Sequence, residues 1–225
     1  MFYAYVKLFF RLPTRIYLGL KAEGCERVPR HGPALIVANH ASFLDPIVLG
    51  CACPRKIHFV VLQSMYEWKR LRWFYWGMQT IPVRAEESDP RAVKQVLSRL
   101  RRGDLVGIFP EGGRSGDGVL QPAKPGAALL AAVSGAPVIP AYIDGAWTAW
   151  RPKTLFPMPG RVRVRFGEPI RFGAPGAKQR GREEVDAFSR RIMEAIADLA
   201  SEGSRESDDR GGGKRAAAAR SAGNP

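Results

Sequence analysis

From Ala34 onward, short apolar runs alternate with longer amphipathic patterns, an order typical of α/β proteins. Six runs predict strands, at residues 34 to 38, 57 to 62, 79 to 83, 105 to 109, 137 to 143 and 161 to 167. Three patterns with helical spacing predict helices, at about 89 to 103, 125 to 134 and 182 to 200. We therefore expect an α/β fold with one domain over residues 25–200, in which helices flank a mixed, largely parallel central sheet.

Residues 1–24 precede this domain and are rich in aromatic and aliphatic side chains. Their apolar runs are interrupted by Lys7, Arg11, Pro13 and Arg15. These runs are much shorter than the roughly 20 residues of a membrane span, and no small-residue cleavage site follows them. Lys7 and Arg11 share one helical face, whereas the other face gathers Phe2, Tyr5, Phe9 and Leu12. We expect an amphipathic helix in the membrane interface, with a helix packed on the protein's own core as the alternative.

The segment 65–79 mixes aromatic and basic side chains in a way that suits the headgroup region of a bilayer. It contains Trp68, Trp73 and Trp76 together with Arg72. Indole rings prefer the interface and cations attract anionic lipid, so we expect a second docking helix here. Two alternatives stay open, a buried aromatic helix and a surface on which nucleic-acid bases stack.

The charge balance indicates an anionic partner. The 225 residues contain 35 lysines and arginines against 21 acidic residues, which gives +14 and a pI of about 10.3. Net charge alone does not choose among nucleic acid, acidic lipid and a phosphorylated small molecule. Residues 201–225 lack large apolar side chains, so we expect a disordered tail there. Three cysteines and three histidines argue against a metal site or a disulfide framework.

A histidine and a carboxylate follow the apolar run at residues 34–38, in the stretch NHASFLD. Ligands of open α/β sheets bind beyond the carboxyl ends of strands, so His40 would face a substrate. A bond from His40 to Asp45 requires a loop or a first helical turn, because positions i and i+5 diverge on a regular helix. The local sequence allows a capping box from Ser42 to Asp45, or Asp45 as an N-cap before Pro46. Such a pair suits general-base chemistry, and a simple helix cap is the alternative.

Three further stretches lie at or after predicted strands. An arginine follows the run at 79–83, the sequence FPEGGRS occupies 109–115, and prolines bracket an apolar strand at 136–141. Arginine's planar fork binds phosphate oxygens, and glycine lets the backbone approach a ligand closely. The candidate binding residues are Arg84, Glu111, Gly112, Arg114 and Lys124. Taken singly, each stretch is also explained by a surface arginine, a glycine turn or a buried strand.

Taken together and in this order, these stretches closely resemble the glycerolipid acyltransferase family, whose best-known members are the lysophosphatidate acyltransferases. The family pattern is Asn-His-x4-Asp, a block with a glycine and an arginine, Phe-Pro-Glu-Gly-Thr-Arg-Ser, and a proline-bracketed apolar block. The resemblance covers about residues 25 to 170. It implies that His40 is the general base and that Asp45 orients it.

The resemblance also implies how the acceptor is held. Arg84 and Arg114 would hold the acceptor's phosphate, Glu111 would help to organise the acceptor site, and Lys124 would add to it. Gly113 stands where the family usually has threonine, which leaves the identity of the acceptor open.

The implied activity is acyl transfer from acyl-CoA or acyl-carrier protein to the free hydroxyl of lysophosphatidate, without a bound cofactor or metal. Such an enzyme would be a peripheral or monotopic protein on the cytoplasmic side of the cell membrane, in contact with anionic lipid and without a nucleic-acid partner. One alternative is a relative that acylates glycerol 3-phosphate or a lyso-aminolipid. Another is a non-catalytic basic protein that binds nucleic acid or membrane. A hydrolase using Ser42 or Ser115 is disfavoured, since neither serine lies in a G-x-S-x-G elbow.

Overall fold

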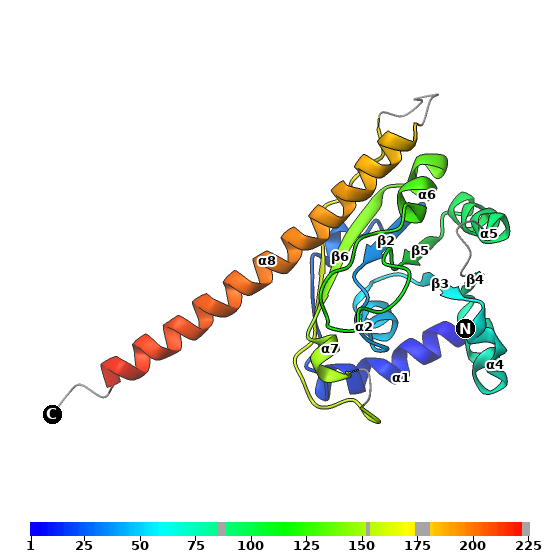
Figure 1. The fold of residues 1–225 in the computed structure, drawn as a ribbon. Coiled ribbons are helices and arrows are strands. Elements are labelled where there is room, and N and C mark those ends of the chain that lie inside the picture. The colour runs from blue at the N-terminus through cyan, green and yellow to red at the C-terminus, as the bar shows by residue number, and fades with distance from the viewer. Residues whose placement is uncertain (85–88, 152–153, 174–180, 222–225) are drawn as a thin grey trace.

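The computed structural model describes residues 1–84, 89–151, 154–173 and 181–221, with side chains up to residue 203. Its centre is a seven-stranded sheet with the order β1-β7-β6-β2-β5-β3-β4 (Figure 1). The strands are β1 (Lys21–Glu23), β2 (Ala34–Ala38), β3 (Ile57–Leu62), β4 (Ile81–Val83), β5 (Leu105–Ile108), β6 (Val138–Asp144) and β7 (Arg163–Phe166). Neighbouring strands pair in parallel except β6 and β7. The predicted mixed, largely parallel sheet is confirmed.

Helices lie on both faces of this sheet (Figure 1). They are α1 (Phe2–Ile16), α2 (Asp45–Ala52), α3 (Ser64–Glu67), α4 (Lys69–Met78), α5 (Pro90–Arg101), α6 (Gly126–Ser134), α7 (Ala146–Ala149) and α8 (Arg182–Ser221), with a 3₁₀ turn at Cys25–Arg27. Helices α5 and α6 and the start of α8 match the three predicted helices. Asp89 caps α5 by accepting from the N–H groups of Arg91 and Ala92. This cap explains why the sequence pattern predicted the start of the helix correctly.

The central strand β2 shows why the core has two halves. Successive side chains of a strand point to opposite faces, and all five residues of β2 are buried. Ala34, Ile36 and Ala38 pack with α2 and α7, whereas Leu35 and Val37 pack with α5, α6 and α8. The sheet is therefore covered on both sides, as a parallel sheet requires. This burial leaves the ends of the strands as the accessible places for a site.

Some element boundaries differ from the sequence-based expectation. Strand β1 was not predicted, because three residues with two exposed side chains carry little pattern. The strand expected at 79–83 begins at Ile81, since Gln79 adopts a left-handed conformation (φ 56°) that ends α4. The single helix expected over 65–79 is divided into α3 and α4, because Trp68 between them has an extended ψ of 93°.

The C-terminal segment also differs from expectation. Helix α8 runs for 40 residues to Ser221, so the backbone of residues 201–221 is helical where a disordered tail was expected. No proline interrupts the segment, and four consecutive alanines favour a helix near its end. Figure 1 shows this part of α8 projecting beyond the sheet. Residues 222–225 of the predicted tail lie outside the described part of the chain.

Helix α1 is apolar on two faces rather than one. Its inner side packs on α2 and α4, and Tyr3 and Thr14 are buried there. Lys7, expected on a polar face with Arg11, instead donates from Nζ to the carbonyl of Cys53 at the end of α2. The outer face exposes large apolar side chains at Tyr5, Leu8, Phe9, Leu12 and Ile16. Among the described helices, none combines the length and the hydropathy that crossing a membrane would require.

Gly145 joins β6 to α7, and we expect that it cannot be replaced. Its φ is +77°, and an added Cβ would lie 2.1 Å from the carbonyl oxygen of Arg161. Backbone strain together with this clash should lower the free energy of unfolding of Gly145→Ala by about 3 kcal/mol. Urea unfolding measures the loss. Gly116→Ala is the control, since its Cβ meets no atom within 4 Å; equal stability of the two variants would contradict the expectation.

Candidate active site

The carboxylate of Asp45 organises the loop between β2 and α2. Asp45 is fully buried at the first position of α2. Its Oδ2 accepts from His40 Nδ1 at 2.8 Å and from the main-chain N–H groups of Ala41 and Ser42 at 2.7 Å each. The loop folds back over the start of the helix, so the two residues meet despite their spacing. The contact between His40 and Asp45 that the sequence suggested is therefore present.

Of the two local capping hypotheses, the capping box is met in part and the N-cap role of Asp45 is not. Asp45 reaches back to the Ser42 N–H, which is one half of a capping box. The other half is absent from the bonds described for this loop, because Ser42 Oγ accepts from Leu44 N and donates to the carbonyl of Trp150. Asp45 is the first helical residue rather than the N-cap, which is Leu44. The carboxylate therefore hydrogen-bonds the loop before α2 and is not the N-cap of the helix.

The bond to Asp45 determines how the imidazole of His40 presents itself. A carboxylate acceptor makes Nδ1 the proton-bearing nitrogen, so Nε2 is the nitrogen that can take a proton. The ring stacks on Phe109 with a centroid distance of 4.1 Å, and 19% of the side chain is exposed. Asn39 anchors the adjacent backbone, since its side-chain amide bonds both the N–H and the carbonyl of Ile143 on β6. The ring is thus positioned by Asp45 and Phe109 and remains partly exposed.

The loop at residues 109–115 forms hydrogen bonds with the main chain of His40. Glu111 Oε1 accepts from the His40 N–H at 2.7 Å, and Ser115 N–H donates to the His40 carbonyl at 2.8 Å. Glu111 Oε2 accepts from the N–H of Gln121 at 3.2 Å. Burial raises the pKa of Glu111, while the two N–H donors oppose that rise. Both oxygens of Glu111 thus face the protein's own backbone, which ties three loops together.

Glycine and arginine follow Glu111 at the open side of the ring. Gly112 has φ +74°, and an added Cβ would lie 2.7 Å from Cε of Lys124. The exposed guanidinium of Arg114 lies over the ring of Phe43, 3.5 Å from its centroid, and Phe43 in turn contacts the ring of Trp150. A guanidinium on an aromatic face is positioned while its N–H groups stay available to an anion.

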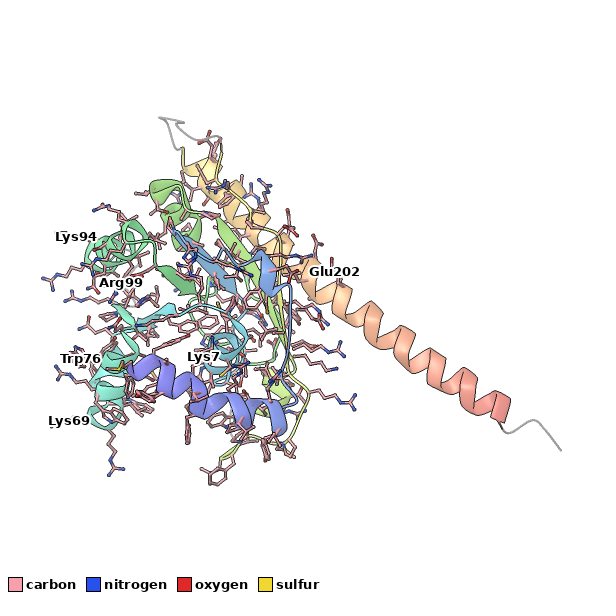
Figure 2. All side chains as sticks on the ribbon, turned by 180° about the vertical axis from the view of Figure 1, so that it is seen from behind. Lys7, Lys69, Trp76, Lys94, Arg99 and Glu202 are labelled. Carbon is pink, nitrogen blue, oxygen red and sulfur yellow. The ribbon has the colours of Figure 1, made fainter. Side chains whose placement is uncertain are left out.

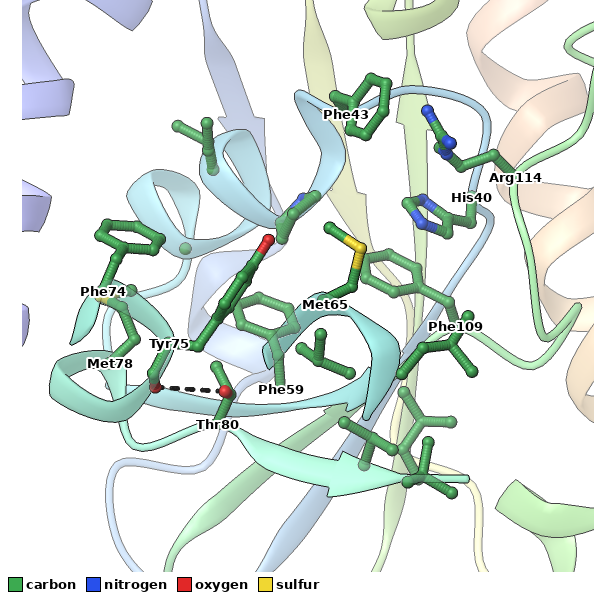
Figure 3. A pocket seen from close by; sticks show the side chains of 18 of the residues that line it. His40, Phe43, Phe59, Met65, Phe74, Tyr75, Met78, Thr80, Phe109 and Arg114 are labelled. Atoms are coloured by element: carbon green, nitrogen blue, oxygen red, sulfur yellow. Dashed lines mark hydrogen bonds between the residues drawn. The ribbon is translucent and has the colours of Figure 1, made fainter. Parts of the chain in front are cut away.

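An apolar cavity of about 430 Å³ begins at these residues. It runs between the inner side of α1, helix α2, strand β3 and helix α4, and its lining includes Phe10, Ile47, Phe59, Phe74 and Met78. Figure 3 shows His40 and Arg114 at one end and Phe74 and Met78 at the other. The site thus joins a polar mouth to a long apolar interior, which suits a molecule with one polar and one apolar part.

Lys7 is a basic residue of the cavity wall. Its bond to the Cys53 carbonyl places a cation at the carboxyl end of α2, where the helix dipole favours positive charge. Burial lowers the pKa of Lys7. The residue therefore joins α1 to α2 at the side of the cavity.

Comparison with known proteins identifies the family. A family model described as acyltransferase matches residues 19–144, which is more than half of the chain. The chain belongs to the acyltransferase family. The matched range includes His40, Asp45 and the loop at 109–115, and the resemblance predicted from the sequence is confirmed.

Individual relatives cover this acyltransferase to different extents. A 1-acyl-sn-glycerol-3-phosphate acyltransferase of Bacillus subtilis (strain 168) is 30% identical, over 78% of this chain and 87% of its own length. The chloroplastic 1-acyl-sn-glycerol-3-phosphate acyltransferase BAT2 of Brassica napus is 33% identical over 55% of this chain, which spans 36% of that protein. The crystal structure of the 1-acyl-sn-glycerophosphate (LPA) acyltransferase PlsC from Thermotoga maritima is 22% identical, with a TM-score of 0.70 over 88% of this chain and 79% of that chain. This last likeness shows the fold.

The candidate binding residues of this acyltransferase do not all meet at the cavity. Gly112 and Arg114 line it, and the exposed Lys124 packs against Gly112. Arg84 is exposed directly after β4, where its N–H donates to Asp89, and the described lining includes Val83 but not Arg84. The short strand β4 ends before it brings that side chain over the mouth.

The candidate docking residues of the acyltransferase are all exposed. They are Phe9 on α1, Trp68 before α4, and Arg72, Trp73 and Trp76 on α4. Figure 2 shows Lys69 and Trp76 at the outer edge of the molecule. Phe2 packs edge-on against Trp73 and Phe74, and Gly77 leaves room for it, since an added Cβ would lie 2.6 Å from the Phe2 ring. The two segments form one continuous wall whose outer surface carries large apolar and basic side chains.

Sequence reasoning missed several residues of the site. Phe43 lies inside the His-x4-Asp stretch, yet its position under Arg114 depends on loop geometry. The cavity wall draws on Tyr3, Gly50 and Phe59 from three separate elements. An apolar pattern predicts that such residues are buried, but it does not say whether they fill a core or line a space.

Replacing the Asp45 carboxylate should destabilise the loop. In Asp45→Ala the Oδ2 atom is gone that accepts from the N–H groups of Ala41 and Ser42 and from the His40 ring, so all three donors lose their partner. We expect the free energy of unfolding to fall by on the order of 3 kcal/mol, measured by urea unfolding. Asp117→Ala is the control, because Asp117 is exposed and accepts from the N–H of Val119. A loss no larger than that of the control would contradict this role of Asp45.

Proposed function

We propose that this acyltransferase moves an acyl chain from an acyl thioester to the free hydroxyl of lysophosphatidate and so produces phosphatidate. The observation that carries the proposal is the His40 ring, held by a buried carboxylate at the mouth of an apolar cavity beside Arg114. The names of the Bacillus subtilis and Brassica napus relatives support the acceptor. The donor is acyl-CoA or acyl-carrier protein.

The chemistry needs one base and no nucleophile from the enzyme. His40 Nε2 takes the proton of the acceptor hydroxyl as its oxygen attacks the thioester carbonyl. Asp45 stabilises the imidazolium that forms. Collapse of the tetrahedral intermediate breaks the carbon–sulfur bond, and the leaving thiolate receives the proton from His40. A thioester is already activated, so these groups suffice to complete the transfer.

The cavity supports the placement of the acyl chain. Its walls are mainly aliphatic and aromatic, and its depth leads away from His40 towards Phe74 and Met78. A hydrocarbon chain leaves water on entering such a space, which supplies binding free energy without polar contacts. The thioester carbonyl would then lie at the mouth, next to the His40 ring.

We assign the acceptor's phosphate to Arg114. Its guanidinium is exposed at the mouth and is positioned by Phe43, and Lys124 lies behind Gly112 in the same loop region. Gly112 brings the backbone close to the phosphate, and Glu111 holds the loop in place. Arg84 lies outside the cavity lining, so we give it a secondary role at the rim.

One observation favours a second acceptor class. Gly113 lines the cavity mouth, and an added Cβ would meet no atom within 4 Å. The threonine usual in the family would occupy this open space. Glycerol 3-phosphate or a lyso-aminolipid is therefore the alternative acceptor.

The exposed apolar surfaces support a membrane location. Phe9, Trp68, Trp73 and Trp76 would enter the interface, and Arg72 would meet anionic headgroups. We place the enzyme on the cytoplasmic side of the cell membrane as a peripheral or monotopic protein.

Loss of the base should remove most turnover. We expect His40→Ala to lower kcat by about 10² to 10⁴ fold, measured as release of free thiol from an acyl thioester in the presence of lysophosphatidate. The exposed His31 supplies the matched control, since it precedes β2 and so lies at the opposite end of that strand from His40. Full turnover by a folded His40→Ala variant would show that another group is the base.

Loss of the Arg114 guanidinium should act on acceptor binding. We expect Arg114→Ala to raise the KM for lysophosphatidate about tenfold, with a smaller change in kcat, because a charge-assisted contact is lost. The KM for an acceptor without phosphate should stay unchanged. Arg101→Ala, on the exposed side of α5, is the control. A panel of acceptors tests the alternative, and a wild-type preference for an acceptor without phosphate would contradict the phosphate site.

A further inference from the structure

A loop outside the two predicted docking segments exposes large apolar side chains. Leu155 is 81% exposed, Phe156 72% and Met158 61%. They occupy the connection between α7 and β7, where Pro157 and Pro159 alternate with them. Three such side chains within four residues form an apolar patch, and patches of this kind mark interaction surfaces.

This loop is held firmly at its base. Tyr17 Oη donates to the Pro157 carbonyl at 3.1 Å, and Met158 N–H donates to the Ala149 carbonyl at 2.7 Å. Trp150 Nε1 donates to the Thr154 carbonyl at 3.0 Å. The backbone is thus tied to the end of α1 and to α7, while the apolar side chains remain outside. A held loop presents its side chains at no further ordering cost.

The patch continues the outer face of α1. Ile16, 75% exposed, and Tyr17 end that face, and Tyr17 is the residue that bonds the loop. Figures 1 and 2 show α4, α1 and the connection after α7 along the same lower edge of the molecule, from opposite sides. The three elements therefore lie along one edge of the molecule, and α1 contacts both of the others.

The charge of these segments indicates what covers this edge. Residues 1–22 contain four basic residues and no acidic residue, and residues 145–161 contain three basic residues and no acidic residue. The described arginines Arg11, Arg15, Arg151 and Arg161 are exposed. Apolar side chains in two segments that carry basic and no acidic residues suit an anionic bilayer, in which the apolar side chains enter the interface and the cations meet headgroups.

We propose that residues 154–160 are a third membrane-contact element, in which Leu155 and Phe156 insert into an anionic bilayer beside the mouth of the active site. The link to the mouth is Trp150, whose carbonyl accepts from Ser42 Oγ and whose ring contacts Phe43. The loop would therefore place the lipid surface next to the cavity mouth, where Arg114 is proposed to bind the acceptor. This inference rests on the proposed membrane docking through α1 and α4.

The test compares vesicle binding of two double variants of the full chain. Leu155→Ser/Phe156→Ser should bind phosphatidylcholine–phosphatidylglycerol vesicles about tenfold or more weakly in co-sedimentation, because two apolar side chains no longer leave water. It should keep wild-type turnover on a short-chain acceptor that is monomeric in solution. Leu129→Ser/Val133→Ser is the control, since it removes two exposed apolar side chains from α6 and should bind as the wild type does.

A third variant, Phe9→Ser/Leu12→Ser on α1, separates this inference from the proposed docking. Wild-type binding by the loop variant with weakened binding by the α1 variant would overturn the role of residues 154–160 and leave docking by α1 intact. Wild-type binding by both would overturn both. Should the wild type sediment as a dimer and the loop variant as a monomer with unchanged vesicle binding, the patch would be a contact between copies, and the lipid proposal would fail.

Discussion

The buried carboxylate of Asp45 is the constraint on which the site depends. A charge removed from water must be met by donors, and three come from His40, Ala41 and Ser42. The loop after β2 therefore has one shape, and the imidazole one orientation. The loop after β5 adds a second constraint, because Glu111 and Ser115 bond the His40 main chain on both sides. Parallel pairing of β2 with β5 brings these loops to the same edge of the sheet.

Helix α1 separates two apolar environments. Its inner side contributes Tyr3, Val6 and Phe10 to the cavity, and its outer side exposes another apolar row. The helix is fastened to α2 by Lys7 and to α4 by Phe2, whose ring fits where Gly77 has no side chain. One helix thus serves as the wall of an acyl site and as part of a lipid-facing surface. A chain substrate held inside this wall would lie close to the bilayer from which lipids come.

Much of the fold could be predicted from the sequence because many of its elements have a clear local sequence pattern. Strand β2 is a run of buried apolar residues, and α5 has a capping aspartate, a proline and a terminal glycine around an amphipathic pattern. Elements with weak sequence patterns were missed. Strand β1, with three residues, was not predicted, and the interruption of the helix at Trp68 was not predicted either. The expected role of Arg84 assumed that every strand end reaches the site, but β4 is a short edge strand and its arginine stays outside the described lining. The contact between His40 and Asp45 was predicted, whereas its partners in the loops were not.

By itself the sequence determined the fold class, the family, and which residues could act as base and orienting carboxylate, since residue type and spacing carry that information. Only the tertiary structure decided what those residues touch. Phe43 lies under Arg114, Phe109 lies against His40, and α1 closes the cavity against α2, β3 and α4 from later in the chain. The exposed loop at Leu155 and Phe156 likewise became part of a surface only when α1 was placed beside it. Such contacts depend on the packing of distant segments, and no local pattern of apolar and polar residues encodes the partner that each segment meets.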